Sequence, residues 1–382
     1  MISKADASDK TLLGGIAPRD FMAKHWQKQW RLMRGALPAF EELIDSKALF
    51  TLACTDDVES RLILRDGKAW TLENGPFTKK RLAALPARDW TLLVQGLNLH
   101  VPAADALLRR FSFLPYARLD DVMISLAAPG GGVGPHCDSY DVFLLQGIGA
   151  RLWKISEQTD LELEPDAPLK ILKKLKPSET FDVTAGDMLY LPPQIAHDGV
   201  ATQTVGFCTT YSIGFRAPTH QEIADGFLDW IGATSELDGR LEDADLTATT
   251  NPARVPKLYQ REIFAAIEKL QMDRNAIRQF AGCFATDVKP QIVFVAPDQP
   301  MLRAAFGKAA VSKGVTFAAA TMCLYDDEFL FINGEAFVIK GDSVFWRALA
   351  DERHSLVPAK QAGETVDALY AWYCDGWLRL NN

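Results

Sequence analysis

The sequence predicts a mainly β protein with additional α-helices, built around a sandwich or barrel of short strands. Between about residues 88 and 215, short runs of β-branched and aromatic residues alternate with glycine and proline. This pattern is typical of short strands joined by turns. After residue 217 the spacing becomes helical, and a separate hairpin signal follows near residue 333. At 382 residues, the chain is long enough for two or three domains.

Five segments carry the strand prediction. Each is rich in residues that fit a pleated, half-buried surface, and each is bounded by turn-forming residues. They are VMISLAA (122–128), DVFLLQG (141–147), ARLWKI (150–155), MLYLP (188–192) and GFCTTYSIGF (206–215). The segment at 20–50 predicts helix and loop that lead into this region.

The part after residue 217 predicts helices of a different kind. Thr219-His220-Gln221-Glu222 is a capping-box pattern that opens a helix. Helical spacing returns at Tyr259, Ile263, Ile267 and Leu270. These helices have few partners within their own segment, so we expect them to pack on another surface, such as a second subunit.

The C-terminal part predicts a small third unit. Asn333-Gly334 within FLFINGEAFVI (329–339) is a strong signal for a type I′ hairpin. Apolar helices are expected around 343–351 and 364–379. A hairpin with flanking helices fits a winged-helix shape or a small α+β cap equally well.

Composition excludes several classes of function. The net charge is −8, and most of the excess of acids lies after residue 218. A nucleic-acid or membrane footprint would be basic, so we expect neither DNA nor membrane binding. No apolar run approaches about 18 residues, and the start lacks a signal-peptide pattern. The six cysteines form no CxxC pair, which favours reduced thiols and a cytoplasmic location.

The segment GPHCDSY (134–140) contains the first candidate metal ligands, His136 and Asp138. In an extended strand, these two side chains point to the same face. A return strand within GDMLYLPPQIAHDGV (186–200) would bring His197 beside them. Taken singly, each of these residues is more often structural than metal-binding. Together, two histidines and one carboxylate suit Fe(II) and leave three coordination positions open.

Arg151 follows on the strand ARLWKI, where a hairpin would direct its side chain into the barrel. A buried guanidinium is costly unless an anion meets it. The distal carboxylate of 2-oxoglutarate is such an anion, because the guanidinium fork can hold it at two points. An exposed or ion-paired arginine is the alternative.

The segment VMISLAAPGGGVGPHCDSYDVFLLQGIGARLWKI, followed by GDMLYLPPQIAHDGV and YSIGFRAP, resembles the JmjC-type 2-oxoglutarate oxygenases. The resemblance is closest to the bacterial ribosomal oxygenases, which are arginine hydroxylases of a large-subunit ribosomal protein. DFMAKHWQKQW and VESRLI…GKAWTLENGPF are similar to the same family, so the likeness spans residues 20–218. Beyond residue 218, the resemblance depends only on the order of the predicted parts, a helical region followed by a winged-helix-like tail.

This resemblance implies a fold and three domains. The core would be a double-stranded β-helix of the jelly-roll or cupin type. The expected domains are an oxygenase domain at 1–218 with its core at about 88–216, a helical dimerisation region at 219–295, and a winged-helix-like domain at 296–382.

The resemblance also implies roles for individual residues. His136, Asp138 and His197 would bind Fe(II), with 2-oxoglutarate as co-substrate and O₂ as oxidant. Arg151 would hold 2-oxoglutarate, with Ser125 and Thr210 nearby. Tyr140 and Asp141 are expected to contact the substrate. For a substrate guanidinium, the candidate acidic partners are Asp120, Asp121 and Asp141.

The expected partners are a basic ribosomal protein as substrate and a second copy of the chain in a homodimer. Three other functions stay open at this point. One is the same chemistry on a histidine, a methyl-lysine or another protein side chain. A second is a cupin metalloenzyme that works without 2-oxoglutarate, which would leave Arg151 without a role. A third is a non-catalytic module that binds a basic protein.

Overall fold

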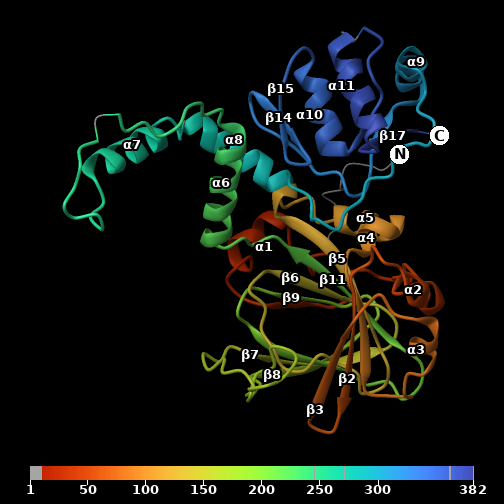
Figure 1. Cartoon of the computed structure of the whole chain (residues 1–382). Coiled ribbons are helices and arrows are strands. Elements are labelled where there is room, and N and C mark those ends of the chain that lie inside the picture. The colour runs from red at the N-terminus through yellow and green to blue at the C-terminus, as the bar shows by residue number, and fades with distance from the viewer. Residues whose placement is uncertain (1–10, 245, 271, 361–362, 382) are drawn as a thin grey trace. The chain divides into compact units, whose positions relative to one another are not determined.

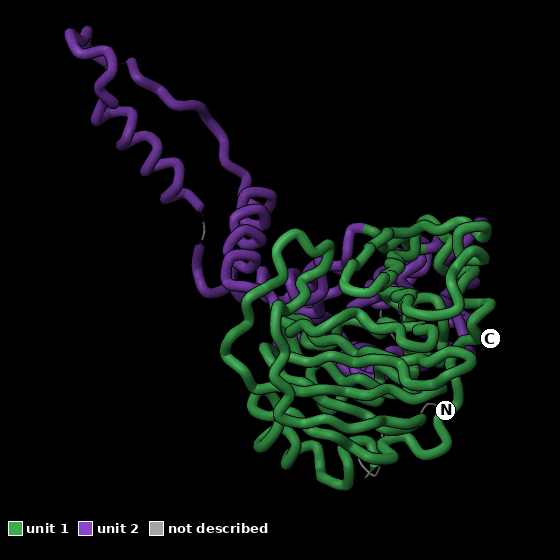
Figure 2. The backbone as a smooth tube through the Cα atoms, turned by 90° about the horizontal axis from the view of Figure 1, so that it is seen from below, with its two compact units in different colours: residues 1–217, 291–294 green, residues 218–290, 295–382 purple. Residues whose placement is uncertain are grey.

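The computed structural model describes residues 11–244, 246–270, 272–360 and 363–381 (Figure 1). The chain divides into two compact units (Figure 2). The first comprises Met1–Ala217 with Gln291–Phe294, and the second comprises Pro218–Pro290 with Val295–Asn382. Within the described ranges, no helix is both long and apolar enough to cross a membrane.

The first unit is mainly β, as the sequence predicts. Its strands are β1 (Arg31–Met33), β2 (Ser60–Asp66), β3 (Ala69–Asn74), β4 (Trp90–Val94), β5 (Leu119–Ala127), β6 (Val142–Gln146), β7 (Ala150–Ser156), β8 (Glu179–Thr184), β9 (Met188–Leu191), β10 (Ala196–Ala201) and β11 (Cys208–Phe215). Its helices are α1 (Pro18–Lys24), α2 (Ser46–Leu52), α3 (Lys79–Ala83), α4 (Leu97–His100), α5 (Pro102–Arg109) and a 3₁₀ turn at Tyr116–Arg118.

Two antiparallel sheets form this unit. The larger has the order β1-β9-β6-β11-β5-β4-β2-β3, and the smaller has the order β10-β7-β8. The sheets pack through a shared apolar cluster that includes Leu144 of β6 and Leu189 of β9 on one side and Ile155 of β7 on the other. Along β7, burial alternates from residue to residue, which is the pattern of a strand with one face on a core. All five predicted strand segments are confirmed as strands.

The larger sheet extends beyond the range 88–216 that the sequence predicts for the core. The hairpin of β2 and β3 adds two strands at one edge, and β1 adds one at the other. Residues 60–66 and 69–74 pair in antiparallel register, with Ile63 opposite Leu72. Their charged and exposed positions make the strand signal weak, because β3 is an edge strand and half of it faces solvent.

Among the described residues, the second unit contains the helices after residue 218 and two three-stranded sheets. Its helices are α6 (His220–Thr234), α7 (Lys257–Glu268), α8 (Arg274–Thr286), α9 (Arg303–Lys313), α10 (Ser343–Glu352) and α11 (Gly363–Cys374). Its strands are β12 (Val315–Phe317), β13 (Cys323–Tyr325), β14 (Phe329–Ile332), β15 (Glu335–Val338), β16 (His354–Ser355) and β17 (Leu378–Leu380).

Several predictions for this part are confirmed. α6 begins with a complete capping box, in which Thr219 and Glu222 bond reciprocally. Asn333 and Gly334 both have positive φ, 49° and 88°, and join β14 to β15 as a hairpin. The helix predicted for 364–379 is too long. α11 ends at Cys374, because Gly376 takes a left-handed conformation (φ 76°) and the chain then forms β17.

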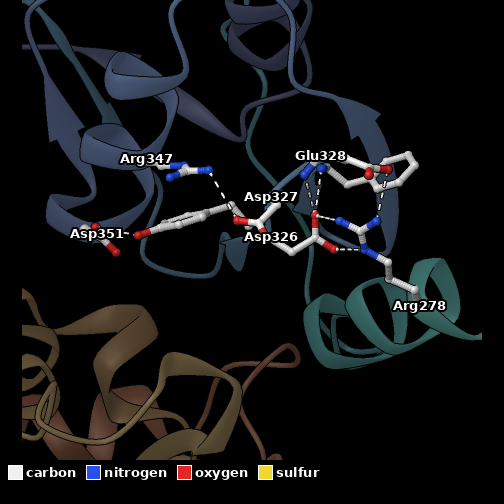
Figure 3. A network of polar contacts seen from close by, with 8 residues as sticks. Arg278, Asp326, Asp327, Glu328, Arg347 and Asp351 are labelled. Atoms are coloured by element: carbon white, nitrogen blue, oxygen red, sulfur yellow. Dashed lines mark hydrogen bonds and ion pairs between the residues drawn. The ribbon is translucent and has the colours of Figure 1, made fainter. Parts of the chain in front are cut away.

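Inside the second unit, hydrogen bonds and ion pairs between charged residues connect α8 to the β13–β14 turn (Figure 3). Arg278 donates to both oxygens of Asp326 at 2.6 and 2.9 Å, and its guanidinium lies 5.5 Å from the Phe329 ring centre. A two-point contact of this kind fixes orientation as well as distance. The unit boundary after Ala217 lies next to the predicted boundary at 218. The predicted division of the remainder into 219–295 and 296–382 stays a prediction, as does its winged-helix-like character.

Candidate active site

The backbones of His136 and His197 pair directly. The His136 amide donates to the His197 carbonyl at 2.9 Å, and the His197 amide donates back at 2.8 Å. The two residues form an isolated antiparallel bridge between His197 of β10 and His136, which lies outside the named strands. The predicted return strand therefore lies beside the segment after the glycine-rich loop. The two imidazole ring centres are 4.2 Å apart.

Asp138 completes the group. One of its carboxylate oxygens lies 3.9 Å from Nε2 of His136, and the other lies 3.8 Å from Nε2 of His197. One potential ligand atom from each of the three residues lies within 4.8 Å of the others. Each histidine also has Nδ1 at 2.9 Å from a backbone carbonyl, that of Gly134 for His136 and that of Ile195 for His197. An Nδ1–H that donates to a carbonyl leaves Nε2 unprotonated and turned toward the centre of the group, as metal binding requires.

The electrostatics of the group fit a cation. Burial lowers the pKa of His197 well below its ordinary value, and the neighbouring His136 lowers it further. Burial also raises the pKa of Asp138, although His136 opposes this change. Each shift opposes the charged form of its group. A divalent cation at the centre would offset the cost of ionising Asp138 and would use the neutral form of His197.

Arg151 points into the interior of the first unit, as predicted, and its exposed fraction is only 3 %. Nη1 donates to the Gly199 carbonyl at 2.9 Å, and Nη2 lies 3.5 Å from the Ser125 hydroxyl. Among the described residues, Nε has no hydrogen-bond partner. No carboxylate pairs with this guanidinium in the described part of the chain. A buried cation in this state is costly, and an anion beside it would offset the cost.

The residues predicted to lie near the co-substrate do come together. Ser125 of β5 pairs in register with Thr210 of β11, so both side chains share one face of the larger sheet. Both are buried, with exposed fractions of 7 and 3 %. The Thr210 hydroxyl is 3.4 Å from the side-chain oxygen of Gln146. Their roles toward a co-substrate stay predictions.

The glycine-rich loop packs closely against β10. A Cβ atom at Gly132 would lie 2.7 Å from the Gly199 carbonyl oxygen, which is the same oxygen that Arg151 bonds. Gly134 has a φ of +80°, and its carbonyl accepts from His136. Glycine is thus required at 132 for space and at 134 for backbone conformation.

The two predicted substrate residues differ in position. Tyr140 is 40 % exposed, and the groups that do cover it, together with nearby Asp138, raise the pKa of its phenol. Asp141 has no exposed surface, and its carboxylate accepts from the Tyr190 hydroxyl and from the Gln27 amide. Both carboxylate oxygens of Asp141 thus accept from protein donors, which favours a structural role for this side chain. The predicted substrate contact through Asp141 stays a prediction.

Sequence reasoning missed some residues around the site. Trp153, interpreted as core packing, does lie in the apolar core, but its ring centre is also 5.8 Å from both the His197 ring and the Arg151 guanidinium carbon. A Cβ atom at Gly199 would lie only 2.5 Å from the Trp153 ring. The period-two spacing of Arg151 and Trp153 on one strand was the available signal.

Comparison with known proteins supports one family. Residues 106–223 match the JmjC domain. The ribosomal protein uL16 3-hydroxylase of Escherichia coli (strain K12) is 35 % identical over 286 residues, which cover 74 % of this chain and 74 % of that protein. The chain belongs to the JmjC-domain ribosomal oxygenases. A probable ribosomal oxygenase of Haemophilus influenzae is 33 % identical over 266 residues, 68 % of this chain and 65 % of that protein.

Solved structures of ribosomal oxygenases share the fold. YcfD, a ribosomal oxygenase from E. coli, gives a TM-score of 0.78 at 27 % identity and covers 96 % of this chain and 98 % of that one. A structure of YcfD in complex with cobalt and 2-oxoglutarate also gives 0.78, at 28 % identity, with 95 and 98 % of the chains covered. The expectation of a JmjC or cupin-like core from the sequence is confirmed.

Proposed function

We propose that this ribosomal oxygenase uses Fe(II), 2-oxoglutarate and O₂ to hydroxylate an arginine side chain of a basic large-subunit ribosomal protein. The observation that carries the proposal is the convergence of His136, Asp138 and His197 within 4.8 Å, with the buried Arg151 nearby, which has no carboxylate partner among the described residues. The relatives named for uL16 hydroxylation and ribosomal oxygenation support the class of substrate.

The residues present fit the proposed metal. Two imidazoles and one carboxylate are the ligand set of Fe(II) oxygenases that keep open coordination positions. When bound, Fe(II) and 2-oxoglutarate supply the oxidation that inserts one oxygen atom of O₂ into a C–H bond and releases succinate and CO₂. The protein orients this chemistry. The carbonyls of Gly134 and Ile195 hold the two imidazoles with Nε2 inward.

Arg151 would hold the distal carboxylate of 2-oxoglutarate. Its Nη1 is already fixed by Gly199, so the fork is oriented before the anion arrives. The neighbouring hydroxyls of Ser125 and Thr210 can donate to the same carboxylate. In a metalloenzyme that works without 2-oxoglutarate, the buried Arg151 guanidinium would have no anion to bind.

Tyr140 and Asp121 would recognise the substrate. Asp121 stands two residues before Met123 and four before Ser125 on β5, so it shares their face of the sheet. It is close enough to Tyr140 to act on the pKa of its phenol. Its carboxylate accepts from the Gln95 amide at 2.7 Å and from the Gly96 amide at 3.0 Å, which hold it in place. A fixed carboxylate beside an aromatic ring suits a guanidinium, since the ring adds a cation–π contact.

The test is turnover with defined peptides. The protein is loaded anaerobically with Fe(II) and 2-oxoglutarate, and O₂ is then added with basic ribosomal peptides that carry one arginine or one histidine. We expect a mass increase of about 16 units, one oxygen atom, on the arginine peptide, with equimolar succinate. His136→Ala should abolish both products.

The alternatives give different results. Oxygen on the histidine peptide alone would change the target but keep the chemistry. Succinate formation without oxidation of either peptide would show that the protein is an oxygenase that acts on another substrate. Failure to bind 2-oxoglutarate with any metal would reject the proposal.

We also propose that α7 takes part in a homodimer and that the enzyme works in the cytoplasm, where its ribosomal substrate would be made. α7 presents the apolar side chains of Tyr259, Ile263, Phe264 and Ile267, which are each at least 41 % exposed. A surface of this kind is costly in water unless covered. The third part, 296–382, is proposed as a winged-helix-like domain that does not bind DNA, because it is acidic.

The dimer is tested by light scattering of the eluting protein. Phe264→Glu should halve the measured mass. Val344→Glu, at another exposed apolar position on α10, is the control and should leave it unchanged.

A further inference from the structure

The segment Asp138–Asp141 connects the predicted metal ligand to β6, and it is anchored at both ends. At the first end, the Asp138 carbonyl accepts from the Gln194 amide at 2.8 Å. At the other end, the fully buried Asp141 carboxylate is held by side chains far away in the sequence. Ser139 and Tyr140 lie exposed between these two anchors. The direction in which Tyr140 points therefore depends on how firmly Asp141 is held.

We propose that Tyr190 and Gln27, acting through Asp141, are positioning residues that fix the orientation of Tyr140 toward the substrate. This inference rests on the proposed function, in which Tyr140 contacts the substrate. It assigns a role in substrate binding to the segment around Gln27, from which none of the site residues named above comes.

Tyr190, Asp141 and Gln27 are each hydrogen-bonded to the other two. The Tyr190 hydroxyl donates to Oδ1 of Asp141 at 2.6 Å, and the Gln27 side-chain amide donates to Oδ2 at 2.9 Å. The backbone amide of Gln27 donates to the Tyr190 hydroxyl at 2.8 Å. Arg118 adds a longer contact of 3.5 Å to Oδ2. Burial and the Asp141 carboxylate raise the pKa of Tyr190, so its hydroxyl stays protonated and able to donate.

Gln27 is held in an unfavourable conformation, which indicates that the surrounding contacts determine it. Its φ is 54°, in the left-handed region that residues other than glycine rarely occupy. The Trp26 side chain beside it stacks on Tyr190 with ring centres 5.9 Å apart, and Phe21 of α1 packs edge-on at 4.9 Å. The N-terminal segment is thus fitted to Tyr190 by packing and to Asp141 by hydrogen bonds.

Tyr190→Phe is the informative variant, because it removes the hydroxyl and keeps the ring that packs on Phe21 and Trp26. Tyr211→Phe is the matched control. Tyr211 is equally buried, and its hydroxyl contacts the Glu42 carboxylate at 3.0 Å and accepts from the Leu43 amide at 3.1 Å. Both variants lose a bond to a carboxylate and bonding from backbone amides, but only Tyr190 contacts Asp141.

The first readout does not require activity. 3-Fluorotyrosine is placed at position 140 alone, and its ¹⁹F resonance is recorded in the full-length protein. We expect one narrow resonance in the parent protein and in Tyr211→Phe. In Tyr190→Phe we expect a shifted, broadened or split resonance. An unchanged resonance in Tyr190→Phe, or an equal change in both variants, would overturn the proposal.

The second readout compares the effect of each variant on KM for the arginine peptide with its effect on KM for 2-oxoglutarate. Tyr190→Phe should raise KM for the arginine peptide about five- to tenfold, the scale of one lost hydrogen bond of ordinary strength. Its KM for 2-oxoglutarate should stay within about twofold, and Tyr211→Phe should change neither constant. Equal increases in both constants would contradict a positioning role. If the parent protein oxidises no peptide, the proposed function fails, while the ¹⁹F comparison still decides the positioning role.

Discussion

Arg151 is the residue with the sharpest expected effect on one ligand. Arg151→Ala should raise KM for 2-oxoglutarate by about 100-fold or more, because a buried two-point contact with a carboxylate is lost. Arg151→Lys should recover little of this, since an ammonium lacks the planar fork.

The affinity for the metal should change by less than about threefold in both variants, because Arg151 binds no ligand atom of the metal. Metal titration followed by 2-oxoglutarate titration separates the two effects. If metal affinity falls as far as 2-oxoglutarate affinity, the assigned role of Arg151 is wrong.

Asp187 gives a prediction about pH. Burial raises the pKa of its carboxyl, but hydrogen bonds from the amides of Gly35 and Thr184 and from Arg34 outweigh burial and lower it overall. Because the folded-state pKa lies below that of the unfolded chain, the stabilisation is complete above about pH 4 and is lost as the pH falls through the folded value.

Asp187→Asn should therefore lower the free energy of unfolding by about 1–3 kcal/mol at pH 7, and the difference should shrink toward pH 3. Chemical denaturation at several pH values measures it. Asp327→Asn, at a side chain that is 96 % exposed, should show neither effect.

Single residues of the site could be predicted where a spacing rule applied. Alternation along an extended chain predicted that His136 and Asp138 share a face, and they do converge, although the structure has no strand there beyond the bridge at His136. Arg151 could be placed inside because its strand has one buried face. Asp141 could not be placed, because the partners that enclose it, Tyr190 and Gln27, are 49 and 114 residues away in the chain. Sequence spacing carries no information on such contacts.

At the scale of elements, the packing of α8 on β14 depends on a glycine. A Cβ atom at Gly282 would lie 2.3 Å from the Phe331 ring. Alanine improves intrinsic helix stability by about 1 kcal/mol, but forcing an overlap into a packed core costs about 1–3 kcal/mol. We expect Gly282→Ala to destabilise the protein overall.

Gly232→Ala in α6 is the matched control, because a Cβ atom there meets nothing within 4 Å. It should stabilise the protein by about 0.5–1 kcal/mol. Thermal unfolding of both variants gives the two signs. Stabilisation by both substitutions would show that α8 can move away from Phe331 at little cost.

Elements with strong local signals were predicted, and those stabilised by neighbours were not. The capping box at Thr219 and the turn at Asn333-Gly334 involve contacts within a few residues, so the local sequence is enough to predict them. β8 and β3 are edge strands with many exposed positions, and only their pairing partners make them strands.

At the scale of the whole molecule, the net charge of −8 should favour encounter with a basic substrate. Raising the salt concentration from about 50 to 300 mM should raise KM for the arginine peptide several-fold, since exposed charges are screened over about 10 Å or less. KM for 2-oxoglutarate should rise less, because its proposed partner Arg151 is buried. Equal sensitivity of the two constants would count against long-range attraction of the peptide.

The whole-molecule organisation was predictable only at its first boundary. The change from strand to helix spacing near residue 217 coincides with the end of the first unit at Ala217. Gln291–Phe294 also belongs to the first unit, and the sequence does not predict this assignment. Four residues are too few to show a hydrophobic periodicity.

The backbone pairing of His136 with His197 has a consequence for how the protein would respond to its metal. An ion bound by these residues would act as a removable cross-link that closes a loop of about sixty residues, and ligands that bind only the folded chain raise its stability by mass action. Chelation should therefore lower the melting temperature and speed amide exchange at positions 136 and 197 together, so that the enzyme's durability would track the supply of its metal.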